Sequence, residues 1–106
     1  FECSIVDRRG ADIWCRAPNG TLFGLEVKAS ASKTTGDRYH SFRIAKKEAD
    51  QFMLTCLDTN LFRVFSREKL LDRMGKNTSD MLHMKPEEFS EELMLEDIDR
   101  LTKYYS

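Results

Sequence analysis

The sequence predicts one α/β (α+β) domain, in which helices flank a mixed central sheet of about four strands. Residues 1–29 contain three short runs of strand-forming residues, separated by turn formers. Apolar residues recur at intervals of three and four after residue 45 and again after residue 86, as in amphipathic helices. A chain of 106 residues with 41% hydrophobic and 33% charged residues suits one compact core.

The first three strands form the most sharply defined part of this prediction. Residues 1–6 alternate loosely, and residues 7–10 form a turn that ends in Gly10. Residues 11–16 and 22–29 are the next two strands, joined by a three-residue loop, Pro18-Asn19-Gly20, whose glycine suits the left-handed third position. In the resulting antiparallel register, Asp12 lies directly opposite Glu26.

The apolar pattern of the hairpin supports the same register. One face is apolar throughout: Ala11, Ile13, Cys15, Phe23, Leu25 and Val27. The other face carries the polar residues: Asp12, Trp14, Arg16, Leu22, Gly24, Glu26 and Lys28. A two-residue Asn19-Gly20 loop would shift the pairing by one residue and mix polar with apolar side chains on both faces. We therefore reject the shorter loop.

In the middle of the chain, the residue pattern predicts a loop, two strands and two helices. Residues 30–41 are polar and rich in turn formers, and residues 42–44 form a short strand. The stripe Ala49, Phe52, Met53, Cys56 and Leu57 predicts a helix from Ala45 to near Asp58. A buried strand over residues 61–65 follows. The next helix begins after a Ser66 cap and stops at Gly75.

The last third of the chain is acidic. We expect a linker over residues 76–85 and a helix that begins at Pro86, with Glu87 and Glu88 stabilising its first turn. Its apolar stripe is Phe89, Leu93, Ile98, Leu101 and Tyr105. This stripe either packs on the core or docks on a partner, another domain or a second copy of the chain. We divide the chain into a core, residues 1–76, and an acidic linker with a C-terminal helix, residues 77–106.

Charge is distributed unevenly along the chain, whose net charge is −1. Residues 1–76 carry 14 Lys or Arg against 10 Asp or Glu, which gives +4, and residues 77–106 carry 3 against 8, which gives −5. The basic part could meet a polyanion, although a solvated surface explains the same excess.

The three cysteines, Cys3, Cys15 and Cys56, are odd in number and each lies in an apolar run. We expect buried free thiols, and therefore a reducing, intracellular compartment. The Cys and His spacing does not resemble a zinc site, and His40 and His83 are expected on the surface without a catalytic role.

The sequence also lacks a membrane-spanning run and a signal peptide. Because it begins in a strand, at Phe1, we expect a further element upstream.

The predicted register places three candidate catalytic side chains, Asp12, Glu26 and Lys28, on the polar face of the hairpin. Two carboxylates placed opposite one another repel, and a metal ion between Asp12 and Glu26 would remove that cost. Mg²⁺ prefers oxygen ligands and is commonly held by one or two carboxylates together with substrate phosphates. Lys28 projects from the same face as Glu26, where it can orient an attacking water and stabilise charge on a phosphoryl oxygen. The simpler interpretation is an exposed Glu26–Lys28 salt bridge.

These residues resemble the PD-(D/E)xK nuclease superfamily, which has the restriction-endonuclease-like fold. Gly10-Ala11-Asp12-Ile13 is similar to its metal-binding aspartate strand, and Leu25-Glu26-Val27-Lys28 is similar to its E-x-K strand. The expected helix and strand that follow match its core order. Two features depart from the pattern: Ala11 replaces the usual proline, and the helix that normally precedes the first strand is absent, with Glu2 a poor substitute for its acidic residue.

A finer resemblance is to the small C-terminal domains of NO VEIN-type proteins. It rests on Glu26-Val27-Lys28-Ala29-Ser30, on Phe42-Arg43-Ile44 and on Glu48. The superfamily resemblance implies a nuclease dependent on Mg²⁺ or Mn²⁺, with Asp12, Glu26 and Lys28 as catalytic residues. It also implies that Asp12, Glu26 and the backbone carbonyl of Val27 bind the metal.

The expected substrate is nucleic acid, with DNA favoured over RNA and no membrane involved. We expect its backbone to be bound by residues that follow the hairpin: Ser30, Ser32, Lys33, Arg38, Arg43, Lys46 and Lys47. Trp14 either stacks on a base or covers the sheet. The alternative function is a catalytically silent module on the same fold that binds nucleic acid or protein.

Overall fold

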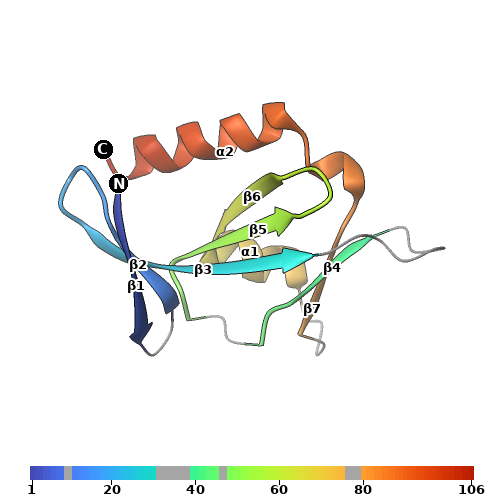
Figure 1. Cartoon of the computed structure of the whole chain (residues 1–106), viewed down its shortest axis with the longest axis horizontal. Coiled ribbons are helices and arrows are strands. Elements are labelled where there is room, and N and C mark those ends of the chain that lie inside the picture. The colour runs from blue at the N-terminus through green and yellow to red at the C-terminus, as the bar shows by residue number, and fades with distance from the viewer. Residues whose placement is uncertain (9–10, 31–38, 46–47, 76–79) are drawn as a thin grey trace.

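Figure 1 shows the computed structural model of the chain, which describes residues 1–8, 11–30, 39–45, 48–75 and 80–106. At residues 5–8 and 11–12 only the backbone is described. The described elements, in chain order, are β1 (Glu2–Arg8), β2 (Ala11–Arg16), β3 (Leu22–Ser30), β4 (His40–Arg43), β5 (Gln51–Cys56), β6 (Leu61–Ser66), α1 (Arg67–Met74), β7 (Met81–Met84), the 3₁₀ helix η1 (Pro86–Glu88) and α2 (Glu91–Tyr104). The predicted fold class is confirmed.

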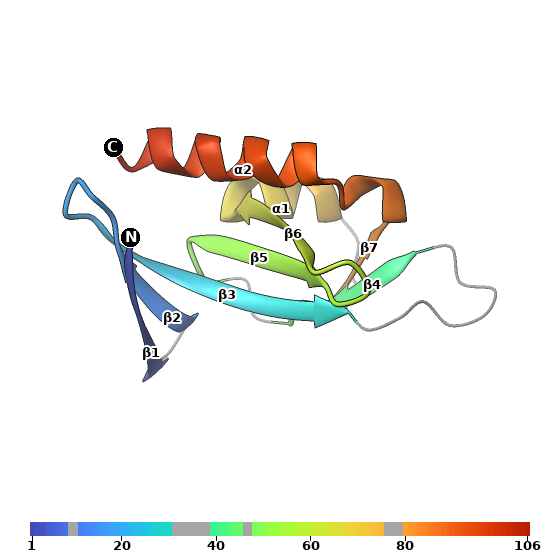
Figure 2. The same cartoon turned by 45° about the horizontal axis from the view of Figure 1, so that its top comes forward.

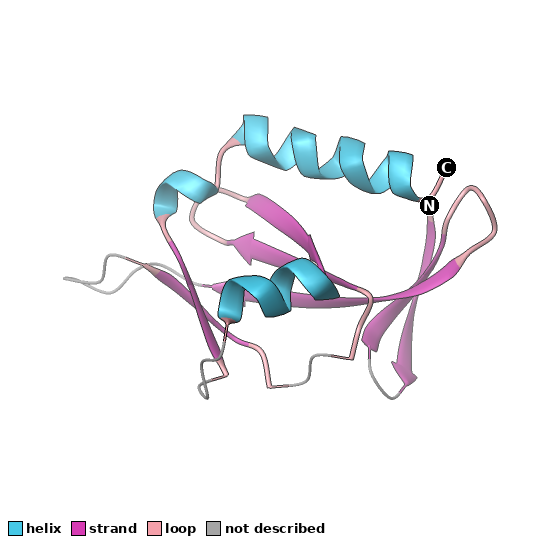
Figure 3. Ribbon diagram, turned by 180° about the vertical axis from the view of Figure 1, so that it is seen from behind, coloured by secondary structure: helices cyan, strands magenta, loops and turns pink. Residues whose placement is uncertain are grey.

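The strands form two sheets. Five of them make one mixed sheet in the order β1-β2-β3-β5-β6, and β4 pairs with β7 in a two-stranded sheet. β3 and β5 run parallel, whereas the other neighbouring pairs are antiparallel. Figure 3 shows α1 against the back of the main sheet, and Figure 2 shows α2 running alongside β6. No helix in the described ranges is long and apolar enough to cross a membrane.

Apolar side chains form a cluster on each face of the main sheet. On the β5 strand, Phe52 and Leu54 point to the face covered by α1, β4 and β7, with Leu70 of α1 packed against them. Met53 points to the opposite face, where the C-terminal end of α2 packs. There Tyr105 stacks on Phe23, with ring centroids 4.2 Å apart. Apolar packing therefore reaches both faces of the central strand β5.

Polar side chains fasten α2 to β6. Asp97 is only 1% exposed, and its carboxylate accepts hydrogen bonds from Arg63 Nε at 2.7 Å, Val64 N at 2.9 Å and Arg100 Nη2 at 2.8 Å. Arg100 also donates to the Val64 carbonyl at 2.8 Å. The predicted helix stripe placed Ile98 inward, which is wrong: Ile98 is exposed, and the neighbouring aspartate is buried instead.

The hairpin of β2 and β3 confirms the predicted loop and register. Ala17 N donates to Thr21 O at 2.8 Å, and Gly20, with φ +87°, donates to Ala17 O at 2.9 Å. The strand pairs run from Arg16 opposite Leu22 to Ile13 opposite Leu25. This is the register that the three-residue loop predicts.

The helix predicted from residue 45 to residue 58 is wrong, because residues 51–56 form β5. A strand that is buried between two other strands and under helices is apolar on both faces, so its sequence does not alternate. The spacing of Phe52, Met53 and Cys56 then imitates a helical stripe. Leu57, which the helix would have buried, is exposed. The expected superfamily core order is therefore not the observed one, in which β4, β5 and β6 follow β3.

Smaller differences occur at the ends of elements. β1 continues to Arg8, through half of the predicted turn, and β4 begins at His40 rather than at Phe42. The predicted linker over residues 76–85 contains β7, which pairs with β4. Pro86 begins the short helix η1 rather than the long helix. The long helix, α2, begins after Ser90, whose Oγ caps it by accepting from Leu93 N at 3.1 Å. The Ser66 cap and the Gly75 stop of α1 are confirmed.

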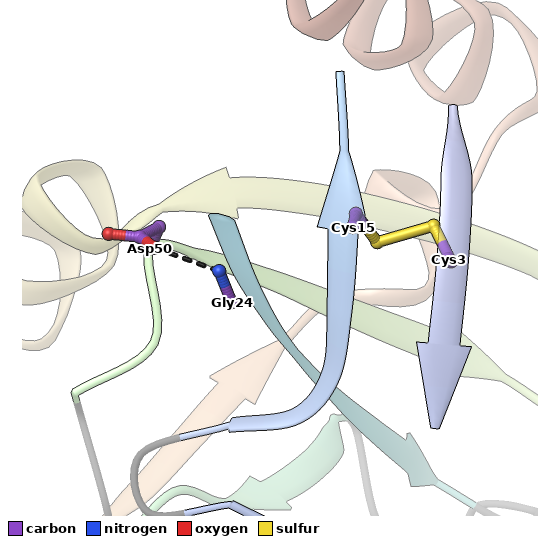
Figure 4. Close-up of a disulfide and its surroundings, with 4 residues drawn as sticks. All are labelled: Cys3, Cys15, Gly24 and Asp50. Atoms are coloured by element: carbon purple, nitrogen blue, oxygen red, sulfur yellow. Dashed lines mark hydrogen bonds between the residues drawn. A yellow bond between two sulfur atoms is a disulfide. The ribbon is translucent and has the colours of Figure 1, made fainter. Parts of the chain in front are cut away.

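The expectation of three free thiols is wrong for two of them. Cys3 and Cys15 face one another across β1 and β2 with Cα atoms 4.1 Å apart, and they form a disulfide (Figure 4). Directly opposed residues in an antiparallel pair can come this close, and no spacing rule in the sequence announces it. The argument for a reducing compartment loses that support. Cys56 is buried and free, as expected.

Candidate functional site

Glu26 and Lys28 lie two residues apart on β3 and point to the same face of the main sheet. Lys28 Nζ is 3.2 Å from Glu26 Oε1, and the two side chains are 37% and 11% exposed. β3 is the central strand of the five, with β2 on one side and β5 on the other. The pair is thus held by strands on both sides, with the ammonium group toward solvent and the carboxylate largely shielded from it.

The neighbouring strand β5 explains why the Glu26 carboxylate is shielded. In the parallel register Glu26 lies beside Phe52, and Lys28 lies beside Leu54. Both of these β5 residues are completely buried. A carboxylate next to such side chains needs a compensating charge or hydrogen bonds, because desolvation of an ion is costly. Among the described side chains, the one paired with Glu26 is Lys28.

Asp50 is a residue of this region that the sequence interpretation missed. Its carboxylate accepts from Gly24 N at 2.8 Å (Figure 4), and its own N–H donates to Gly24 O at 3.0 Å. The two bonds fasten the start of β5 to β3, two residues before Glu26. The acidic residue at the start of an apolar run was the available signal, but the wrong helix placed it mid-element.

On the β2 side, Trp14 lies opposite Gly24. Its indole Nε1 is buried and has no hydrogen-bond partner among the residues that the structure describes. Trp14 is half-buried, as both of its predicted roles, base stacking and cover of the sheet, would allow.

All three predicted metal ligands, Asp12, Glu26 and the Val27 carbonyl, stay predictions. Asp12 lies in β2, one residue before the Ile13–Leu25 pair, but its side chain is outside the described part of the structure. The side chain of Val27 points away from Glu26, into the cluster under α2, as alternation along the strand requires. Its carbonyl as a metal ligand is likewise a prediction.

The predicted nucleic-acid contacts are described at two positions. Ser30 ends β3, where its carbonyl accepts from Leu57 N at 3.1 Å, and Arg43 is exposed at the end of β4. The remaining five lie outside the described residues: Ser32, Lys33, Arg38, Lys46 and Lys47. His83 is on the surface as predicted, but His40 is 3% exposed, so its predicted surface position is wrong.

The Glu26 carboxylate on β3 is the type of ligand that a hard cation such as Mg²⁺ prefers. Mg²⁺ and Mn²⁺ favour carboxylate, carbonyl and water oxygens, and they need few protein ligands when substrate supplies the rest. Glu26 offers a carboxylate in a position of low water access, beside a lysine that can meet an anion. In the hairpin register, the backbone of Asp12 lies on β2, the strand that pairs with β3, one residue before the Ile13–Leu25 pair.

Comparison with known proteins identifies the fold. No protein-family model matches the sequence, and no curated protein does. Among solved structures, a bacterial homing endonuclease, I-Ssp6803I, matches 96% of this chain and 75% of its own length, with a TM-score of 0.65 and 18% sequence identity. The chain shares the fold of that endonuclease. The predicted α+β architecture is thus confirmed.

Proposed function

We propose that the chain is a metal-dependent endonuclease domain of the PD-(D/E)xK type that hydrolyses phosphodiester bonds of DNA. The observation that carries the proposal is the Glu26–Lys28 pair, joined at 3.2 Å on the central strand of a fold shared with a homing endonuclease. An ion pair of this kind on an unrelated fold would be an ordinary salt bridge. The finer NO VEIN resemblance remains part of this proposal.

Glu26 and Asp12 would hold a Mg²⁺ or Mn²⁺ ion, together with the Val27 carbonyl. Such an ion polarises the phosphate and lowers the pKa of the attacking water. Lys28 orients that water and stabilises the negative charge that grows on the phosphoryl oxygens in the transition state. Because the Lys28 side chain is partly exposed, its ammonium can move from Glu26 to a substrate oxygen. Before substrate binds, the ion pair with Glu26 holds the ammonium at the site.

The substrate would be bound through its backbone by the segments that follow β3. Ser30 and Arg43 lie at the ends of this region, and one further serine and four basic residues complete the proposed surface: Ser32, Lys33, Arg38, Lys46 and Lys47. DNA is favoured because the structural neighbour is a homing endonuclease, and RNA is the alternative to be tested.

A second candidate function is a silent module that binds nucleic acid or protein without cutting. The Glu26–Lys28 contact favours it in one respect, since the carboxylate already has a neutralising partner without any metal ion.

A nicking assay on supercoiled plasmid DNA and on single-stranded RNA separates the two candidates. We expect cleavage with Mg²⁺ or Mn²⁺ and none with EDTA. Glu26→Gln, Lys28→Ala and Asp12→Asn should each reduce the rate by about 100-fold or more, as removal of one transition-state contact does. Asp72→Asn on the exposed side of α1 is the matched control and should cut normally. Binding without cleavage in the wild type would establish the silent module.

Thermal melting tests the metal site without substrate. Opposed carboxylates repel, so Asp12→Asn should melt above the wild type in EDTA. Mn²⁺ should then stabilise the wild type by about 2.7 kcal/mol at a hundredfold excess over Kd, and the variant much less. Equal shifts in both proteins would contradict a shared ion.

A further inference from the structure

A second cluster of metal-ligand side chains lies away from Glu26, where β4 meets the end of β5. His40 begins β4, Cys56 ends β5, and Asp58 lies in the turn that follows. Each offers one ligand atom, and the three atoms all lie within 4.8 Å of one another. Cys56 Sγ is 3.5 Å from His40 Nε2. The cluster therefore joins His40 of the two-stranded sheet to Cys56 at the end of the main sheet and to Asp58 in the turn beyond it.

The environment of His40 is unusual for a histidine in a protein core. The ring is 3% exposed and meets Phe89 edge-on, with centroids 5.5 Å apart. Within the described part of the chain, the polar atom that its nitrogens contact is the sulfur of Cys56, itself 1% exposed. A thiol is a weak hydrogen-bond partner, so the pair does not satisfy a buried imidazole well. A bound ion would satisfy both groups.

The three ligand types and their spacing select the metal. Zinc binds thiolate sulfur at about 2.3 Å and imidazole nitrogen at about 2.0–2.1 Å in tetrahedral geometry, so two such ligands lie about 3.6 Å apart. The observed sulfur-to-nitrogen distance is 3.5 Å. The exposed Asp58 has the freedom to complete the third position, with water as the fourth ligand. Mg²⁺ does not suit this set, because it avoids sulfur.

We propose that His40, Cys56 and Asp58 bind a zinc ion that ties β4 to the end of β5. The ion fastens the two-stranded sheet to the main sheet. It is distinct from the hard cation proposed at Glu26, since Cys56 pairs with Ser30, two residues beyond the Lys28 position on β3. The burial of the thiol excludes its use as a nucleophile for a large substrate, which makes a structural role the consistent one.

Cobalt titration of the purified chain tests this site directly. Co²⁺ replaces zinc and absorbs through tetrahedral d–d bands and through charge transfer from a thiolate. We expect both signals at one equivalent per chain and their loss when Zn²⁺ is added. Cys56→Ser should abolish the charge-transfer band. A Cys3→Ser/Cys15→Ser double variant should keep it, because the disulfide sulfurs are not the ligands.

Asp58→Asn serves as a second variant, because its exposed position leaves the fold intact. We expect it to weaken Co²⁺ binding by at least the roughly tenfold that loss of an outer-shell partner costs. Asp72→Asn and Glu26→Gln should bind Co²⁺ here as the wild type does. The Glu26→Gln result separates this proposal from the nuclease proposal, since that variant tests only the other site.

The proposal would be overturned by a wild-type chain that takes up Co²⁺ without a thiolate band, or that fails to bind it. A band that survives in Cys56→Ser would also overturn it. If Cys56→Ser does not fold, Asp58→Asn decides: equal Co²⁺ affinity and equal zinc stabilisation in Asp58→Asn and the wild type would reject the site.

Discussion

Replacing Asp97 with alanine should be among the most destabilising single changes in this protein. The substitution removes the acceptor shared by Arg63, Arg100 and the backbone N–H of Val64. Arg100 is 48% exposed, so water can replace its lost partner. Arg63 is 11% exposed and cannot be rehydrated in the same way. The cost therefore comes mainly from one shielded charge and one buried N–H group.

The expected size follows from those two groups. Breaking a buried ion pair by removing one partner costs about 3–5 kcal/mol. Arg63 keeps a hydrogen bond to the Glu88 carbonyl at 3.1 Å and a contact over the Phe65 ring, which places the loss toward the lower end. Asp97→Asn keeps one acceptor oxygen and loses the charge, so we expect about 2 kcal/mol, the scale of one hydrogen bond to a charged group.

Urea unfolding, followed by the fluorescence of the single tryptophan, measures both variants. The midpoint should fall while the slope with urea stays constant, because the surface exposed on unfolding is unchanged. Asp99→Ala is the matched control on the same helix: its pair with Lys103 is exposed at both ends, and its loss should leave the midpoint where it is. An Asp97→Ala midpoint equal to that of Asp99→Ala would refute the reasoning.

Three further predictions concern pH, the disulfide and substrate binding. Burial raises the pKa of Glu88, but hydrogen bonds from Arg73 and a backbone N–H outweigh it and hold the pKa below its usual 4.5. The stabilisation is therefore present above that pH and lost below it, so the difference in urea midpoint between wild type and Glu88→Gln should shrink on acidification. Reduction of the Cys3–Cys15 bond, which spans 12 residues, should cost about 3 kcal/mol in urea unfolding and leave the double serine variant unaffected. If nucleic acid is bound as proposed, Arg43→Ala should lower the slope of log affinity against log salt by about 0.9 on duplex DNA; an unchanged slope would remove Arg43 from the contact surface.

Sequence alone predicted the hairpin well because its signals are local. Pro18-Asn19-Gly20 defines a loop type, and the loop defines the register. Alternation of side chains then puts Glu26 and Lys28 on one face without further information. The element that failed, β5, is specified by its surroundings: Phe52 is buried and Met53 is partly buried, on opposite faces, because β3, β6 and the helices enclose the strand.

Non-local pairing explains the other differences. β4 and β7 are short strands that are far apart in sequence but pair with one another, with His40 opposite Met84. Neither strand has a strong local pattern of alternating polar and apolar residues. The same pairing brings His40 to Cys56, which no sequence spacing announces. Asp97 is buried in place of Ile98 because the side of α2 that meets β6 carries Asp97, which accepts from Arg63 and from the Val64 N–H.

The contacts between α2 and β6 also decide where the main sheet ends. β6 is an outer strand, and the open backbone groups of outer strands are where proteins recruit strands from other chains and aggregate. At Val64 both of these groups are already occupied, the N–H by Asp97 and the carbonyl by Arg100. Side chains of a helix here take the place that the backbone of a sixth strand would otherwise fill, so a further strand cannot pair with β6 at Val64.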